Sequence, residues 1–172
     1  MIKIKSATQI EQMKKAGALS KMALRHVGAM VRPGVSTFEL DQLAEQIIRM
    51  HGGTPAFKGY GGFPGTICAS INDAVVHGIP NPDMILRDGD IISIDTGAVV
   101  DGWVGDNAWT FFVGTPTPEA KARASRGQCH GQHNHEARRN RETRRGTERH
   151  NRRPRYGYRE QPARWQPLGN LA

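Results

Sequence analysis

The dipeptide Asp101-Gly102 constrains the fold of this 172-residue chain more than any other feature, because it separates two long segments of strand-like composition. Residues 91–100 read IISIDTGAVV and residues 103–113 read WVGDNAWTFFV. Both are rich in β-branched and aromatic side chains. An Asp-Gly pair between two such segments favours a two-residue hairpin turn. We therefore predict an antiparallel hairpin in which Val100 pairs with Trp103.

This register brings two carboxylates to one face of the hairpin. Asp95 falls opposite Ala108 and Asp106 opposite Gly97, which makes the two Asp side chains diagonal neighbours with Cβ atoms a little under ~7 to 8 Å apart. Hard oxygen ligands suit two-metal hydrolytic sites, whose ions lie ~3.5 to 4 Å apart. The alternative, that either Asp is a solvated strand residue or a turn former, stays open on spacing alone. A carboxylate that follows the apolar run 91–94 nevertheless needs a partner.

Two helices are predicted before the strands. Thr8 and Glu11 have the spacing of a capping box, and apolar residues then recur at helical spacing to about residue 29. Ser36 and Glu39 form a second such box, ahead of a helix that Gly52-Gly53 ends.

Shorter strand-like segments follow at residues 66–71 and 74–77. Helices followed by antiparallel strands indicate an α+β fold.

The chain's composition changes near residue 122. Of its 24 Lys and Arg and 16 Asp and Glu, residues 1–120 hold 10 and 12, which leaves 14 and 4 for residues 121–172. Residues 123–172 contain no Val, Ile, Met or Phe, so we expect this Arg-, His- and Gly-rich tail to be disordered. We predict a globular part at 1–122 and a tail at 123–172. One hypothesis for the tail is translation of a G+C-rich coding sequence in a shifted frame.

The cysteine pattern favours a reducing compartment. Cys68 and Cys129 are far apart in the chain and form no Cys-x-x-Cys motif. No apolar run approaches the ~18 residues of a membrane span, and the N-terminus lacks the apolar core of a signal peptide. We expect a cytoplasmic protein that does not associate with membranes.

One ordered set of motifs closely resembles the type I methionine aminopeptidases, from about Ile4 to Lys121. The motifs are CASINDAVVHGIP at residues 68–80, LRDGDIISID at residues 86–95 and DGWVGD at residues 101–106. The resemblance implies a cytosolic metalloenzyme with the α+β "pita-bread" fold, of which this chain holds the N-terminal half. It also implies removal of the N-terminal methionine from nascent polypeptides.

The resemblance assigns roles to individual residues. Asp95 would be a bidentate ligand of the first metal, Asp106 would bridge both ions, and His77 would be a catalytic residue that contacts the substrate amide. The methionine pocket would be lined by Tyr60, Phe63, Cys68 and, nearby, Phe57. Each residue has a plainer alternative: His77 as a surface or core residue, the aromatic residues as loop packing, and Cys68 as a small buried side chain.

The implied mechanism is amide hydrolysis assisted by two divalent ions (cobalt, manganese, iron or zinc; the resemblance leaves the identity open), with His77 helping to stabilise the oxyanion. The family's remaining ligands, one His and two Glu, come from a second half that has no counterpart here. The His-rich tract 129–136 lacks a strand framework that would aim it at Asp95 and Asp106. We therefore expect this chain, as written, to have little or no aminopeptidase activity.

Two further functions remain as alternatives. The Arg-rich tail, with Tyr156, Tyr158 and Trp165, could bind RNA or ribosomes through phosphate contacts and stacking in a non-catalytic protein. The chain could also be a non-catalytic pita-bread relative that binds peptides, although such relatives usually lose the metal-binding Asp residues.

Overall fold

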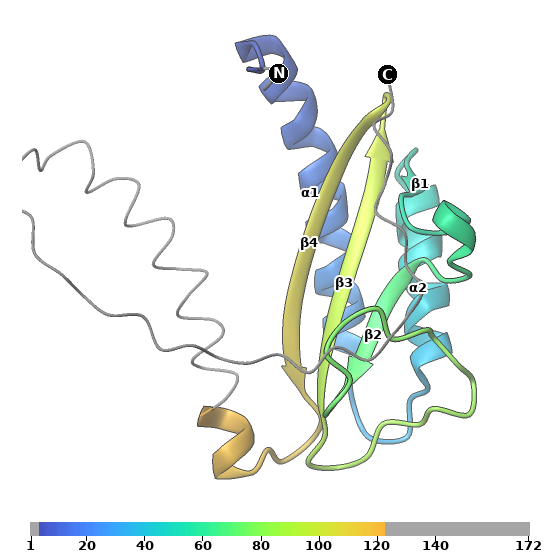
Figure 1. Ribbon diagram of the computed structural model, residues 1–172, viewed down its shortest axis with the longest axis vertical. Helices are drawn as coiled ribbons and strands as arrows, with labels where there is room; N and C mark the ends of the chain where they lie inside the picture. The colour runs from blue at the N-terminus through green and yellow to red at the C-terminus, as the bar shows by residue number, and fades with distance from the viewer. Residues whose placement is uncertain (1–3, 123–172) are drawn as a thin grey trace, which may run out of the picture. The chain divides into compact units, whose positions relative to one another are not determined.

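The computed structural model describes residues 4–122, in which two helices pack on one side of an antiparallel sheet (Figure 1). The elements in chain order are α1 (Ala7–Met30), α2 (Thr37–Met50), β1 (Thr54–Pro55), a 3-10 turn (Tyr60–Gly62), β2 (Ile67–Ile71), β3 (Ile91–Val100) and β4 (Trp103–Phe112). This arrangement confirms the expected α+β class.

The hairpin of β3 and β4 has the predicted register. Val100 pairs with Trp103, Asp95 with Ala108 and Gly97 with Asp106. Asp101 and Gly102 have φ values of 50° and 78°, the positive values that the tight hairpin turn requires. On its other edge, β3 pairs with β2 and with β1, a two-residue strand that the sequence did not predict.

Helix α1 begins at Ala7, close to the expected start, but its N-cap lies two residues earlier than predicted. Ser6, not Thr8, caps the helix: the Gln9 amide donates to Ser6 Oγ over 3.2 Å, and the Ser6 amide donates to Gln9 Oε1 over 2.9 Å. The predicted Thr8–Glu11 box is wrong because the Ser6–Gln9 pair has the same spacing and starts the helix first. Glu11 instead pairs with Lys14 on the exposed surface.

Helix α2 begins at the predicted box. The Glu39 amide donates to Ser36 Oγ over 3.2 Å, and the Ser36 amide donates to the Glu39 carboxylate over 2.8 Å. Helix α2 ends at Met50, and Gly52 follows with a φ of 75°. The predicted stop at Gly52-Gly53 is therefore confirmed.

The second short strand, predicted at residues 74–77, is not a strand. Asn72 has a φ of 53°, which turns the chain out of the sheet directly after β2. Val75 and Val76 then lie exposed at 74% and 65% of their full surface. The apolar run that suggested a strand is therefore part of a loop.

The core lies between the helices and the sheet. Ile92 and Ile94 of β3 are fully buried and pack against apolar residues of both helices and of β2. On the hairpin, Gly105 touches the backbone of α1, where any added Cβ would overlap Ala16 and Gly17. Asn107 donates to Gly17 O over 3.1 Å and to Ser20 Oγ over 3.0 Å. These contacts fix α1 against the hairpin that carries the two Asp residues.

The expectations for the tail at 123–172, including its disorder, its His-rich tract and its Arg-rich RNA contacts, lie outside the described residues. The domain division at residue 122 stays a prediction. Within residues 4–122, no helix has the length and hydrophobicity of a membrane-spanning segment.

Candidate functional site

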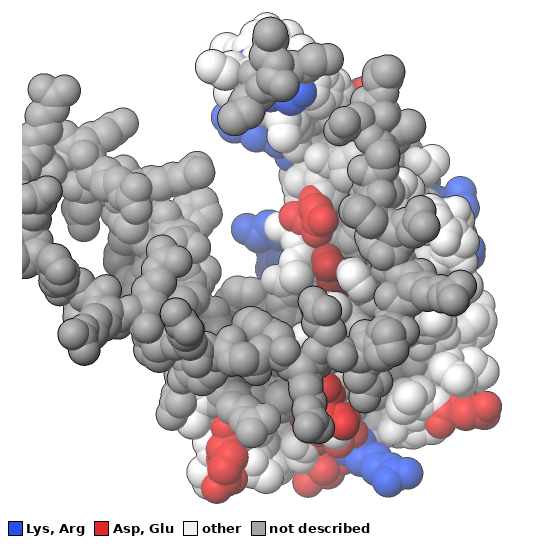
Figure 2. Space-filling view, in the orientation of Figure 1, with Lys and Arg blue, Asp and Glu red and all other residues white. Residues whose placement is uncertain are grey.

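The middle of the sheet face opposite the helices is polar, and we call this region the polar face. Because side chains alternate along each strand, the cross-strand register places one set of residues on this face. Its middle consists of Cys68 and Ser70 of β2, Ser93, Asp95 and Gly97 of β3, and Asp106, Ala108 and Thr110 of β4. Toward the ends of the hairpin the same face carries Ile91, Val99, Val104 and Phe112. Figure 2 shows acidic atoms near the middle of its view, in the region that β3 and β4 occupy in Figure 1.

Asp95 and Asp106 are diagonal neighbours on this face, as the hairpin predicted. Asp95 is partly buried, and its Oδ1 atom is fully buried without a hydrogen-bond partner. Burial, followed by the negative charge of Asp106, raises the pKa of Asp95 from 3.8 to about 7. A buried carboxylate oxygen without a partner is costly, so it is a natural place for a bound cation.

The two carboxylates fit a divalent cation but form only part of a complete site. Carboxylate oxygens are preferred ligands of hard divalent ions, and the unpartnered Oδ1 of Asp95 leaves one lone-pair position open for such an ion. Within residues 4–122, no group of three or more His, Cys, Asp or Glu side chains could hold a metal ion.

Cys68 lies directly opposite Asp95 in the ladder between β2 and β3. Burial, and then the charges of Asp95 and Asp106, raise the pKa of its thiol to about 11. Cys68 is therefore a protonated, buried thiol at neutral pH. A thiolate is the reactive form of cysteine, so this environment does not favour a cysteine nucleophile.

Phe57 lies against Gly97 of β3. A Cβ added to Gly97 would come within 2.7 Å of the Phe57 ring and 2.8 Å of Ala56 Cβ, so both side chains cover Gly97, the cross-strand partner of Asp106. Glycine inside a strand often marks such a close approach. We predicted no contact at Gly97 from the sequence, although a glycine within a strand-like segment is a signal for one.

Tyr60 and Phe63, the other two aromatic residues predicted for the pocket, lie in the loop that follows Phe57. Backbone hydrogen bonds join the Tyr60 amide to Phe57 O over 3.0 Å and the Phe63 amide to Tyr60 O over 3.0 Å. Both side chains are partly buried.

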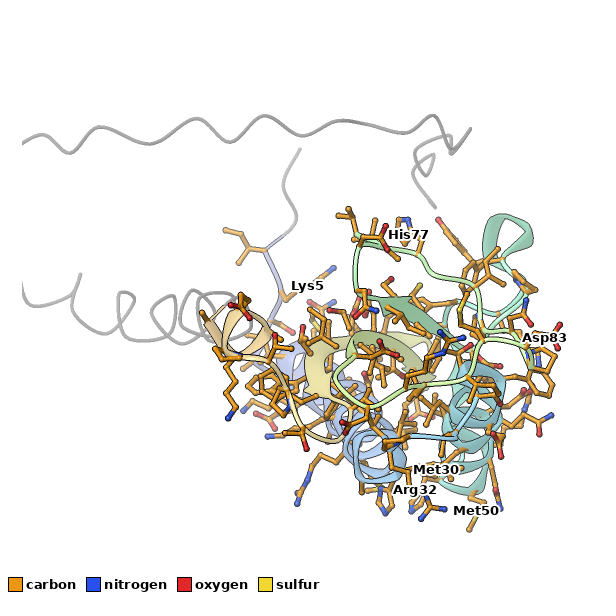
Figure 3. The ribbon with its side chains drawn as sticks, turned by 90° about the horizontal axis from the view of Figure 1, so that it is seen from below. Lys5, Met30, Arg32, Met50, His77 and Asp83 are labelled. Atoms are coloured by element: carbon orange, nitrogen blue, oxygen red, sulfur yellow. The ribbon has the colours of Figure 1, made fainter. Side chains whose placement is uncertain are left out.

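His77 lies in the loop after β2, on the side of the sheet away from the helices (Figure 3). Its φ is 57°, a value that costs free energy for any residue other than glycine. Non-glycine residues in this region occur often at functional sites. The next residue, Gly78, touches β2, where an added Cβ would overlap the backbone of Ala69.

Comparison with known proteins supports the fold and identifies a family. Residues 11–134 match the model of metallopeptidase family M24. The chain is 51% identical over 124 residues to methionine aminopeptidase 1 of Mycobacterium tuberculosis, covering 71% of this chain and 47% of that protein. It is 46% identical over 121 residues to methionine aminopeptidase 1 of Bacillus subtilis, covering 70% and 48%.

Among solved structures, the methionine aminopeptidase from Rickettsia prowazekii superposes with a TM-score of 0.71 at 39% identity, covering 73% of this chain and 50% of that one. The chain thus spans about half the length of the relatives it matches. The elements in residues 4–122 accordingly form the N-terminal half of the pita-bread fold.

Proposed function

Because the chain belongs to metallopeptidase family M24, we propose that residues 1–122 supply the N-terminal half of a methionine aminopeptidase domain. One observation carries this proposal: Asp95 and Asp106 converge on the polar face of the sheet, and Asp95 Oδ1 is buried without a partner. The names of the relatives point to removal of N-terminal methionine as the reaction. The proposed substrates are nascent polypeptides in the cytoplasm.

Asp95 and Asp106 would hold divalent metal in this proposal. A divalent ion bound there supplies Lewis-acid catalysis of amide hydrolysis. The chain itself contributes two carboxylates on the β3–β4 hairpin. Helix α1 packs on the opposite face of this hairpin, where Asn107 donates to Gly17 O. Because the pKa of Asp95 lies at about 7, part of the protein population carries a proton on this carboxyl at neutral pH, and that proton would leave when the ion binds.

The substrate side of the site is assigned to neighbouring residues. Phe57, Tyr60, Phe63 and Cys68 would line the methionine pocket, where a thioether finds favourable contacts with aromatic rings and a thiol. The contact of Phe57 with Gly97 supports this role, because it places an aromatic ring next to the strand positions that carry the carboxylates. His77 would donate to the carbonyl oxygen of the scissile amide.

Two carboxylates alone bind a divalent ion weakly, since high-affinity oxygen sites use six to eight ligands. We therefore propose that the matched half is active only with the ligands of a complete domain. The identity of the metal is left to experiment. The alternative function, RNA or ribosome binding through the tail, gains no support from the relatives described above.

A chimera tests the proposed function. Residues 4–121 of this chain would replace the matching segment of Bacillus subtilis methionine aminopeptidase 1, to which this part is 46% identical. The chimera should release methionine from a Met-Ala-Ser peptide in the presence of Co²⁺ or Mn²⁺, and Asp95→Asn should abolish release. The turn variant Asp101→Asn is the control and should stay active. A folded chimera without activity, or an active Asp95→Asn chimera, would overturn the proposal.

A further inference from the structure

We propose that Ser70 is a positioning residue for His77, and that Asn72 closes the other end of the same loop. The inference rests on the proposed substrate-binding role of His77 and adds the means by which the chain holds the loop that carries His77 on the side of the sheet away from the helices. It follows from the hydrogen bonds at the two ends of residues 72–78 and from the exposure of the residues between them.

We call the hydrogen bonds at each end of residues 72–78 a clamp. The first clamp lies at Gly78. Ser70 Oγ accepts a hydrogen bond from the Gly78 amide over 3.1 Å, and the Ala69 amide donates to Gly78 O over 2.8 Å. Only glycine can lie this close to β2, because an added Cβ would overlap Ala69 O. Ser70 is 4% exposed, so water offers the Gly78 amide no easy replacement at this point. The backbone directly after His77 is thus tied to the strand that carries Cys68.

The second clamp lies at Asn72. Its own amide donates to Ile91 O over 3.0 Å, and its Oδ1 accepts from the Ile91 amide over 3.1 Å. Its Nδ2 donates to Asp90 Oδ1 over 2.9 Å. Asn tolerates the positive φ of 53° that this position requires. The loop therefore leaves the sheet at a point fixed to the start of β3.

Between the clamps, burial of the valine side chains does not anchor the loop. Val75 is 74% exposed and Val76 is 65% exposed. The His77 backbone has a φ of 57°, which a free loop would leave for a more favourable region. The hydrogen bonds at Gly78 and Asn72 tie both ends of this segment to the sheet, and Ser70 acts on the His77 backbone through Gly78.

The test uses the full chain with Co²⁺ added at a concentration that occupies the proposed weak site of Asp95 and Asp106, and the pseudocontact shifts report where each nucleus lies relative to the metal. Signals from Thr96 and Ala108, next to Asp95 along β3 and across from it on β4, report the metal site itself. The ring signal of His77, assigned with His77→Gln, reports the position of the loop. Amide hydrogen exchange of Gly78 is a second readout that needs no metal.

The matched variants are Ser70→Ala, Ser70→Thr and Ser93→Ala. Ser93 lies opposite Ser70 on the same face, and its hydroxyl is hydrogen-bonded to Thr110 rather than to the loop. We expect Ser70→Ala to collapse the shift at His77 while the shifts at Thr96 and Ala108 remain. Exchange of the Gly78 amide should become roughly two- to tenfold faster, the effect of losing one net hydrogen bond. Ser70→Thr and Ser93→Ala should behave as the parent protein does.

Three results would overturn the inference: an unchanged His77 shift in Ser70→Ala, an unchanged Gly78 exchange rate in Ser70→Ala, or equal effects of Ser70→Ala and Ser93→Ala on the His77 shift and the Gly78 exchange rate. A parent protein without shifts at Thr96 and Ala108 would instead overturn the proposed metal site. In that case the Gly78 exchange rates would still decide whether Ser70 holds the loop.

Discussion

Asp106 lies diagonally across the β3–β4 ladder from Asp95, because its direct cross-strand partner is Gly97. The small partner leaves room on the polar face for the ring of Phe57, while the diagonal spacing keeps the two carboxylates close enough to raise the pKa of Asp95. The same two strands thus carry both the candidate metal ligands and the glycine, Gly97, against which the Phe57 ring packs.

The raised pKa of Asp95 predicts a specific pH dependence of stability. The folded protein binds this proton more tightly than the unfolded chain, because the pKa rises from 3.8 to about 7 on folding. The resulting stabilisation is complete below the unfolded pKa and is lost as pH rises through about 7. In EDTA, Asp95→Asn should therefore be more stable than the parent protein above pH 7, with a flatter pH profile in urea denaturation.

Asp101→Asn is the control for this experiment, because it removes a carboxylate from the same hairpin at an exposed turn. Its free energy of unfolding should follow the pH profile of the parent protein. If Asp95→Asn keeps the slope of the parent protein between the two pKa values, burial does not perturb Asp95 as described.

The contact between Gly97 and Phe57 predicts a coupled pair of substitutions. Gly97→Ala should destabilise the protein by about 1 to 3 kcal/mol, because the new methyl group overlaps the Phe57 ring and Ala56. Phe57→Ala should relieve part of this cost, giving a coupling energy of about 0.5 to 3 kcal/mol in a double-mutant cycle. Thermal or urea denaturation of the four proteins measures it.

Gly17→Ala provides the contrast. An added Cβ at Gly17 meets nothing within 4 Å, and the residue lies inside α1. This substitution should stabilise the protein by roughly 0.5 to 1 kcal/mol.

In the double-mutant cycle of Gly97 and Phe57, additive effects of Gly97→Ala and Phe57→Ala would mean that the Phe57 ring does not cover Gly97.

The start of α1 predicts different effects for two neighbouring residues. Ser6→Ala removes the side chain that accepts from the Gln9 amide and should cost about 0.5 to 1 kcal/mol. Thr8→Ala lies within the first turn and should be neutral or stabilising by a few tenths of a kcal/mol, because alanine is the better helix former. Urea denaturation of both variants distinguishes the two caps, and a larger cost for Thr8→Ala would favour the Thr8–Glu11 box.

The incomplete ligand set predicts low activity. With Co²⁺ or Mn²⁺ present, the full 172-residue chain should release little or no methionine from a Met-Ala-Ser peptide, since only two carboxylates of the described part are available to the metal. Bacillus subtilis methionine aminopeptidase 1, assayed in parallel, serves as the reference. Turnover close to that of the reference would show that the chain supplies a complete site.

The hairpin and the placement of its two Asp residues were predictable from sequence because local chemistry determines them. Asp101-Gly102 selects a two-residue turn, and the turn fixes the pairing of every later residue. The capping box at Ser36 is equally local. The sequence also contains the pair Ser6 and Gln9, but two overlapping capping boxes cannot be ranked from spacing alone.

Features that depend on distant contacts were not predictable in the same way. The segment 74–77 has strand-like composition, yet Asn72 leaves the sheet because its side chain bonds with the start of β3. The pKa of Asp95 depends on burial and on the charge of Asp106 together. The side chain that covers Gly97 is Phe57, which lies in a loop about forty residues earlier in the chain.

The most direct test of the central claim, that Asp95 and Asp106 form a divalent-metal site, is a titration of the full chain with Mn²⁺. The readout is the paramagnetic broadening of the backbone amide signals of Cys68 and Ala108, the two cross-strand partners of Asp95. Both signals should broaden at low occupancy in the parent protein and in Asp101→Asn, and neither should broaden at that occupancy in Asp95→Asn or Asp106→Asn. Equal broadening in Asp95→Asn, or none in the parent protein, would contradict the claim.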